Sequence, residues 1–250
     1  MRLPASILAR PFAHRALHDA GDGRPENSLL AVRAAIEVGY GIEIDLQLSR
    51  DGKAMVFHDY RLDRMTVESG LLRDRTAEEL GQISLNDSGD RIPELDDVLA
   101  MVDGQVPLLI ELKDQDGALG PDVGPLEQAV ADALSGYRGD AAVMSFNPHS
   151  LFKLKALLPA TPRGLTTEDF VLADDWDIPL ERRQELNEIG DFEAADACFI
   201  SHNHRHLAMG RVKELKDDGA AVLCWTVKSP EDEAEARRIA DNVTFESYLA

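Results

Sequence analysis

Short apolar segments alternate along this chain with segments of helical periodicity, and this alternation constrains the fold more than any other feature. A continuous apolar run is typical of a strand covered on both faces, so the pattern predicts a parallel sheet with helices packed against it. Eight such strands suit a closed (β/α)8 barrel, and a chain of 250 residues is long enough to form one as a single domain, residues 1–250. The expected strands are residues 11–16, 40–49, 107–113, 141–147, 162–167, 196–203, 220–227 and 242–247.

A doubly wound open sheet is the alternative α/β architecture for such a pattern. When that fold binds dinucleotides, it carries a G-x-G-x-x-G turn after its first strand. No such motif follows the first apolar run of this chain, at residues 11–16. The sequence therefore favours the TIM barrel.

One segment interrupts the alternation. The sequence SRDGKAMVFHD, residues 49–59, follows the second predicted strand without a helix between them. Its Asp51-Gly52 pair is typical of a tight hairpin turn. Residues 60–92 then show little apolar periodicity. We therefore expect them to form a small insertion after the second strand.

Ionisable side chains gather at the predicted carboxyl ends of the strands, where TIM barrels place their active sites. Glu43 and Asp45 lie two residues apart in the second strand, so both point to one face of the sheet. If that face points inward, they converge with Glu111 of the next strand at the barrel mouth. The complete set is His14, Arg15, Glu43, Asp45, His58, Glu111 and Lys113.

The carboxylates of Glu43, Asp45 and Glu111 would raise one another's pKa values and would be costly to desolvate together. One divalent metal ion would compensate them, and all-oxygen ligation suits Mg²⁺ or Ca²⁺ better than zinc. The alternative is that each acid pairs with a lysine or arginine on a surface loop. The two strand-end histidines beside these acids favour a functional site.

His14 and His58 would flank this metal ion from different chain segments. Two imidazoles with pKa values near neutrality can divide the work of a general base and a general acid. Arg15 and Lys113 supply positive charge for a bound phosphate. This equipment suits phosphodiester cleavage: the metal polarises the phosphoryl oxygen, one histidine deprotonates the attacking hydroxyl, and the other protonates the departing alkoxide.

The composition excludes some partners. A formal net charge of −20 repels phosphate backbones and anionic lipid, so we expect no nucleic-acid or membrane partner. No apolar run is long enough to cross a membrane, and the N-terminal residues lack an apolar core of signal-peptide length. Cys198 and Cys224 are too few for a disulfide framework, which is consistent with a reduced, cytoplasmic protein.

Seven short motifs follow one another in order from the first predicted strand to the seventh. They are AHRA at 13–16, RPENS at 24–28, GIEIDLQLSRDGKAMVFHDYRLDRMT at 41–66, IPELDDVL at 92–99, LLIELK at 108–113, SFNP at 145–148 and CWTV at 224–227. Together they resemble the motifs of the glycerophosphodiester phosphodiesterase family. The resemblance implies a TIM barrel with a small insertion after the second strand. It implies metal-dependent hydrolysis of glycerophosphodiesters, such as glycerophosphocholine or glycerophosphoethanolamine, to sn-glycerol 3-phosphate and an alcohol.

The resemblance also implies a role for each matched residue. The implied roles are an acid–base pair (His14 and His58), three metal ligands (Glu43, Asp45 and Glu111), two phosphate-contacting cations (Arg15 and Lys113), two residues that shape the site beside the first strand (Glu26 and Asn27), and two aromatic residues at the mouth (Phe146 and Trp225).

The chain departs from the family pattern at two places. Ala16 stands where glycine is usual, and TFES at 244–247 replaces the usual T-D-x-P.

The sequence stops shortly after its last predicted strand, so we expect the eighth outer helix to be absent. Either the N-terminal residues or another subunit would then cover the gap, which predicts a homo-oligomer. Three histidines alternate in the segment SHNHRH, residues 201–206: His202, His204 and His206. We expect this segment to be an exposed polar loop rather than a metal site, although His202 or Asn203 could also reach the alcohol group of the substrate.

Two other functions are compatible with the residues. A phospholipase acting on intact lipid would need an apolar or basic lip, and residues 60–80 offer few aromatic side chains for one. A non-catalytic barrel that binds glycerophosphodiesters would not need two proton carriers, so His14 and His58 argue against it.

Overall fold

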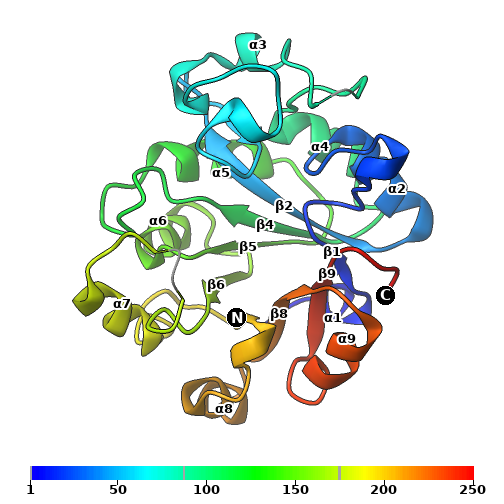
Figure 1. Ribbon diagram of the computed structural model, residues 1–250. Coiled ribbons are helices and arrows are strands. Elements are labelled where there is room, and N and C mark those ends of the chain that lie inside the picture. The colour runs from blue at the N-terminus through cyan, green and yellow to red at the C-terminus, as the bar shows by residue number, and fades with distance from the viewer. Residues whose placement is uncertain (1, 87, 174–175) are drawn as a thin grey trace.

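The computed structural model describes residues 2–86, 88–173 and 176–250. Eight of the described strands run parallel: β1 (Phe12–Ala13), β2 (Gly41–Leu48), β4 (Leu108–Leu112), β5 (Ala141–Ser145), β6 (Arg163–Thr167), β7 (Phe199–Asn203), β8 (Ala221–Val227) and β9 (Asn242–Phe245). They pair in this order, and β1 also pairs with β9, which closes the sheet. The predicted TIM barrel is therefore confirmed (Figure 1).

Helices lie outside the barrel and connect most of its strands (Figure 1). They pack through one apolar side, as in α4, where the buried residues recur every three or four positions. The helices are α1 (Ala5–Ala9), α2 (Leu29–Val38), α3 (Ala77–Leu80), α4 (Leu95–Val102), α5 (Pro125–Leu134), α6 (Pro148–Leu157), α7 (Leu180–Asn187), α8 (Gly210–Asp217) and α9 (Pro230–Ala236), with short 3-10 helices η1 (Ala20–Asp22), η2 (Leu62–Arg64), η3 (Leu72–Asp74) and η4 (His204–His206).

The predicted hairpin is present after β2. Strand β3 (Ala54–Val56) pairs antiparallel with the end of β2, and Gly52 adopts a φ of 84° in the turn, a conformation that glycine accepts without strain. The insertion that follows has a small core of its own, although its sequence shows no regular period. This core consists of Met55, Phe57, Leu62, Met65, Leu72, Ala77, Leu80, Ile83, Leu85 and Ile92.

The interior of the barrel changes from apolar at one end to charged at the other. At the end where the strands begin, Phe12, Leu109, Phe199 and Leu223 pack together with Ile7 of α1. Helix α1 therefore closes this end of the barrel. The ionisable residues are left at the opposite end, where the strands finish.

No helix follows β9 among the described C-terminal residues. The tail covers Phe245 of β9 instead: the rings of Tyr248 and Tyr40 pack against it, with centroids 5.4 and 4.8 Å away. Tyr40 also donates a hydrogen bond to the carbonyl of Ala250. No outer helix is therefore found after β9 in the described residues, as expected. Both the tail and the N-terminal segment contact this strand, because the Asn242 amide donates to the carbonyls of Ile7 and Arg10, each at 2.7 Å. A homo-oligomer stays a prediction.

Candidate active site

Three carboxylates converge at the end of the barrel where the strands finish. Glu43 and Asp45 lie on β2, and Glu111 lies opposite Asp45 in the register of β4. One oxygen from each of the three side chains lies within 4.8 Å of the other two, and all three residues are buried. The structure therefore brings these acids together as the sequence predicts. A buried set of three oxygen donors is of the kind that holds a hard divalent cation.

The charges of these acids are only partly balanced. Burial and the neighbouring charges of Asp45 and Glu111 raise the pKa of Glu43 well above its usual value. Burial would also raise the pKa of Asp45, but the Lys113 ammonium, at 2.8 Å from Asp45 Oδ1, helps to lower it. The same ammonium lies 2.5 Å from Glu111 Oε1. One ammonium shared by two carboxylates leaves Glu43 without an ion pair within the described chain.

Arg15 extends this network toward the first strand. Its backbone N–H donates to Glu43 Oε2 at 2.8 Å, and its Nε lies 3.5 Å from Asp45 Oδ2. Its Nη1 donates to Glu26 Oε1 at 2.9 Å. Arg15 and Lys113, which sequence reasoning assigned to phosphate binding, therefore already contact carboxylates.

Asn27 orients Asp45 directly. Its side-chain amide donates to Asp45 Oδ2 at 2.9 Å and accepts from the Asp45 backbone N–H at 3.2 Å. The helix cap is formed by Ser28, whose hydroxyl accepts from the backbone N–H of Ala31. Because Ser28 caps the helix, the Asn27 side chain is available to the site.

His14 is held by a carboxylate from the far end of the chain. Its Nδ1 donates to Glu246 Oε2 at 2.6 Å, and Lys228 Nζ lies 2.6 Å from the other oxygen, Oε1. Burial lowers the pKa of His14, although the hydrogen bond to Glu246 opposes this shift. The hydrogen bond from His14 in turn lowers the pKa of Glu246. The neutral ring with its proton on Nδ1 presents Nε2 as a proton acceptor.

His58 has a similar arrangement built from its own neighbour. Its Nδ1 donates to Asp59 Oδ1 at 2.7 Å, and its carbonyl accepts from Gln47 Nε2. Arg64 of the insertion donates to both carboxylate oxygens of Asp59 and also to Glu26. The insertion thus supports this side of the site.

These groups surround one small pocket of about 100 Å³. The Phe146 and Trp225 rings form its aromatic side, with centroids 5.5 Å apart, and Trp225 Nε1 donates to the carbonyl of Ser201. Of the predicted site residues, those that line the pocket are His14, Arg15, Glu43, His58, Glu111, Lys113, Phe146 and Trp225. Asp45, Glu26 and Asn27 join it through the hydrogen bonds described above.

Sequence reasoning missed the two carboxylates that hold the histidines. Asp59 directly follows His58 in the sequence, but the motif assigns it no role. Glu246 lies in TFES, the segment that departs from the family pattern T-D-x-P. The sequence signal for Glu246 was its position just after the last strand, where the other site residues also occur.

The expectation of an exposed SHNHRH loop is wrong, because the segment forms the end of β7 and all of η4, and His204 and His206 are only partly exposed. His202 is fully buried at the end of β7, where its Nδ1 hydrogen-bonds the Thr167 hydroxyl at 2.8 Å, and burial lowers its pKa to about 4. His206 accepts a hydrogen bond from the backbone N–H of Asp169. His202 does not line the pocket between His14 and His58.

Known proteins match both the sequence and the fold. The model of the glycerophosphoryl diester phosphodiesterase family matches residues 14–243. A glycerophosphodiester phosphodiesterase from Caldanaerobacter subterraneus subsp. tengcongensis is 30% identical, over 88% of this chain and 86% of the relative. One from Bacillus subtilis is 26% identical, over 87% and 76%. The solved structure of an Oleispira antarctica phosphodiesterase, in complex with the product sn-glycerol-3-phosphate, is 25% identical with a TM-score of 0.76, over 96% of this chain and 94% of that one.

The helices of the described residues give no candidate for a membrane span, because none combines the required length and hydropathy.

Proposed function

Because this chain belongs to the glycerophosphoryl diester phosphodiesterase family and is a phosphodiesterase, we propose that its substrates are glycerophosphodiesters such as glycerophosphocholine and glycerophosphoethanolamine. The products are then sn-glycerol 3-phosphate and the alcohol. The observation that carries this proposal is the pair of carboxylate-bound imidazoles, His14 and His58, lining one pocket with buried acids. Residues 1–250 act in it as one domain, because Arg64 of the insertion contacts the site.

The proposed cofactor is one divalent cation, Mg²⁺ or Ca²⁺, held by Glu43, Asp45 and Glu111. The fit rests on the donor set: three buried carboxylates with oxygens within 4.8 Å, of which Glu43 has a raised pKa and forms no ion pair within the described chain. When bound, the cation polarises the phosphoryl oxygen and neutralises developing charge. Asn27 fixes the Asp45 ligand through two hydrogen bonds.

The two histidines divide the proton transfers. One accepts the proton of the attacking hydroxyl at Nε2, and the other delivers a proton from Nε2 to the departing alkoxide. The carboxylates on Nδ1, Glu246 and Asp59, fix each ring and stabilise its imidazolium form. Positive charge for the phosphate comes from Arg15 and Lys113, which line the same pocket, and Phe146 and Trp225 exclude water from its aromatic side.

The test is the release of sn-glycerol 3-phosphate from glycerophosphocholine and glycerophosphoethanolamine, with and without EDTA. The proposal predicts release that EDTA abolishes and that Mg²⁺ or Ca²⁺ restores. Release only from intact phospholipid would make the protein a phospholipase. Ligand binding without any release would make it a non-catalytic barrel. Release unaffected by EDTA would contradict the metal site.

A further inference from the structure

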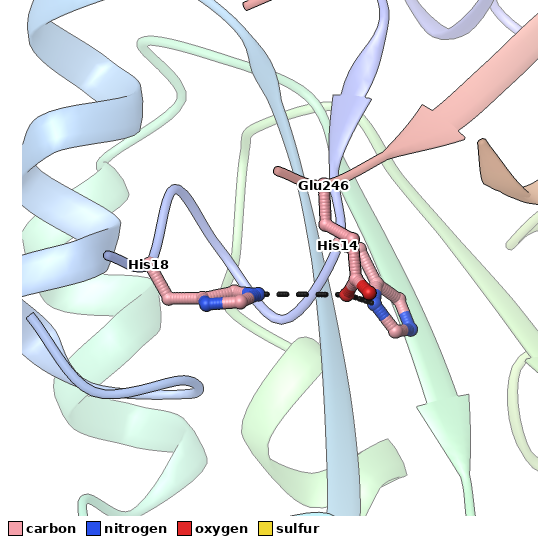
Figure 2. Close-up of side chains that lie close together, drawn as sticks. All are labelled: His14, His18 and Glu246. Carbon is pink, nitrogen blue, oxygen red and sulfur yellow. Dashed lines mark hydrogen bonds and ion pairs between the residues drawn. The ribbon is translucent and has the colours of Figure 1, made fainter. Parts of the chain in front are cut away.

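The described residues contain a second group of potential metal ligands besides the acid cluster. His14 and His18 each have a ring nitrogen directed at the Glu246 carboxylate, from opposite sides (Figure 2). One ligand atom from each of these three residues lies within 4.8 Å of the other two. Two imidazoles and one carboxylate differ in kind from the all-oxygen set at Glu43, Asp45 and Glu111.

The backbone brings the two histidines together. Arg15 and Ala16 both have positive φ angles, 50° and 63°, and the turn they form returns the chain so that His18 comes back toward Glu246. His18 Nε2 lies 3.6 Å from Glu246 Oε2, too far for a hydrogen bond, and it is a buried nitrogen without a hydrogen-bond partner in the described chain. A polar atom that is desolvated and unsatisfied in this way is costly, unless a ligand completes its coordination.

We propose that His14, His18 and Glu246 form a Zn²⁺ site whose occupation inhibits the enzyme. Two histidines with one carboxylate are a ligand set that Zn²⁺ uses in proteins, with metal–ligand distances near 2.0–2.2 Å. Tetrahedral geometry then places ligand atoms about 3.3 Å apart. The separations of 2.6 Å (His14 Nδ1) and 3.6 Å (His18 Nε2) from Glu246 Oε2 bracket this value. Because all three ligand atoms lie within 4.8 Å of one another, side-chain movements can bring them around one ion.

Inhibition follows from which nitrogen the ion takes, given the role of His14 in the proposed function. An ion on Nδ1 replaces the hydrogen bond to Glu246, and the single proton of the neutral ring then resides on Nε2. A ring in this state cannot accept a proton at Nε2, and the nearby dication disfavours the imidazolium form. His14 can then act neither as the general base nor as an imidazolium acid, while the acid cluster stays intact.

The ion can reach this site without passing the substrate. His18 and Glu246 line a separate pocket of about 420 Å³, whereas His14 lines the smaller pocket with the acids. Lys228 competes for the same carboxylate, because its ammonium lies 2.6 Å from Oε1. Its side chain is 60% exposed, so it can turn to solvent when Zn²⁺ binds Oε2.

The test measures Zn²⁺ binding with a chromophoric zinc indicator, in protein saturated with Ca²⁺ so that the acid cluster is occupied. We expect His18→Gln to weaken Zn²⁺ binding at least about tenfold, since losing even a supporting contact of a metal ligand costs that much. Lys228→Met should tighten it. His149→Gln, on α6, is the matched control and should bind Zn²⁺ as the wild type does.

The same proteins are assayed for sn-glycerol 3-phosphate release. We expect His18→Gln to keep wild-type activity without Zn²⁺ and to need at least about ten times more Zn²⁺ for half-inhibition. Equal Zn²⁺ affinity in the wild type and His18→Gln would overturn the site, since Zn²⁺ would then bind only the acid cluster. Binding that His18→Gln weakens, with no inhibition in any variant, would overturn the inhibitory role. If no diester is hydrolysed, the proposed function fails, but the indicator titration still decides the site.

Discussion

The two histidines of the site are held by the same chemistry in two different ways. His58 donates to Asp59, its neighbour in sequence, whereas His14 donates to Glu246, which is 232 residues away. The distances, 2.7 and 2.6 Å, are nearly the same. The comparison shows that equivalent positioning can come from a local motif or from the closure of the barrel, which brings β9 beside β1.

The supports behind the two carboxylates also differ. Asp59 is bound by Arg64, which belongs to the insertion and also donates to Glu26. Glu246 is bound by Lys228, at the end of β8, which makes one contact. The carboxylate that holds His58 therefore belongs to an extended hydrogen-bond network. The carboxylate that holds His14 has a single cationic support and is shared with His18.

Removal of either imidazole should have the largest effect. We expect His14→Ala and His58→Ala each to lower kcat for glycerophosphodiester hydrolysis by about 10²- to 10⁴-fold, because proton transfer contributes that much. Circular dichroism and thermal unfolding check that each variant is folded. His149→Ala serves as the control and should retain activity. Near-normal turnover in either variant removes that histidine from the mechanism.

Loss of the positioning carboxylates should have a smaller effect. We expect Glu246→Gln and Asp59→Asn each to reduce kcat by about 10- to 100-fold with little change in KM, because the ring loses its anionic partner but keeps a hydrogen-bond acceptor. The Glu231→Gln change, at an exposed acid of α9, is the control. If a variant changes KM while kcat stays at the wild-type value, its carboxylate does not position the ring.

The stability of the protein at acid pH should also distinguish the His14–Glu246 pair from the His58–Asp59 pair. The hydrogen bond from His14 lowers the pKa of Glu246 in the folded chain, so its stabilisation is present above its ordinary pKa of 4.5 and is lost as the pH falls. Urea unfolding between about pH 5 and pH 3 should show that Glu246→Gln loses less stability than the wild type, by on the order of 1–3 kcal/mol. An unchanged pH dependence would show that Glu246 is not held as an ionised group.

The pKa of Asp59 is lowered too: burial alone would raise it, but hydrogen bonds from His58 and Arg64 lower it. The sign of its pH dependence is therefore the same. Because the Arg64 side chain is 46% exposed, solvent screens part of this interaction. The difference between Asp59→Asn and the wild type should then be smaller than that for Glu246→Gln, and the reverse order would contradict this comparison.

The smallest effects should come from the exposed cations. We expect Arg64→Ala and Lys228→Ala to lower kcat/KM less than about tenfold and stability by about 1 kcal/mol or less, since exposed ion pairs contribute little. Arg64→Ala should be the more damaging, because Arg64 joins Asp59 to Glu26. The differences in kcat/KM and stability between each variant and the wild type should become smaller at high salt, because salt screens exposed ion pairs.

Much of this molecule follows from the sequence, and the exceptions have physical causes. The alternation of apolar runs predicts the barrel, and the two-residue spacing of Glu43 and Asp45 predicts that both point inward. Glu246 could not be placed, because its partner is separated from it by nearly the whole chain. The polar motif predicts an exposed His202, yet this residue is buried, and only its Nδ1 is hydrogen-bonded there, to the Thr167 hydroxyl.

The cap of α2 is another feature that the sequence alone does not decide. Asn27 and Ser28 are both good helix caps, and only the three-dimensional position of Asp45 decides that Ser28 caps while Asn27 turns to the site. The single domain, the catalytic roles, the homo-oligomer and the cytoplasmic location stay predictions.

The division of labour between the two imidazoles is tested most directly with a substrate whose leaving group needs no protonation. The measurement compares kcat for glycerophosphocholine and for a p-nitrophenyl ester of glycerol 3-phosphate in the wild type, His14→Ala and His58→Ala. The account predicts that one variant recovers at least about 100-fold of its lost activity on the nitrophenyl ester, because only the general acid becomes dispensable, while the other stays inactive. Recovery of both variants, or of neither, would contradict a general base and a general acid placed on two separate histidines.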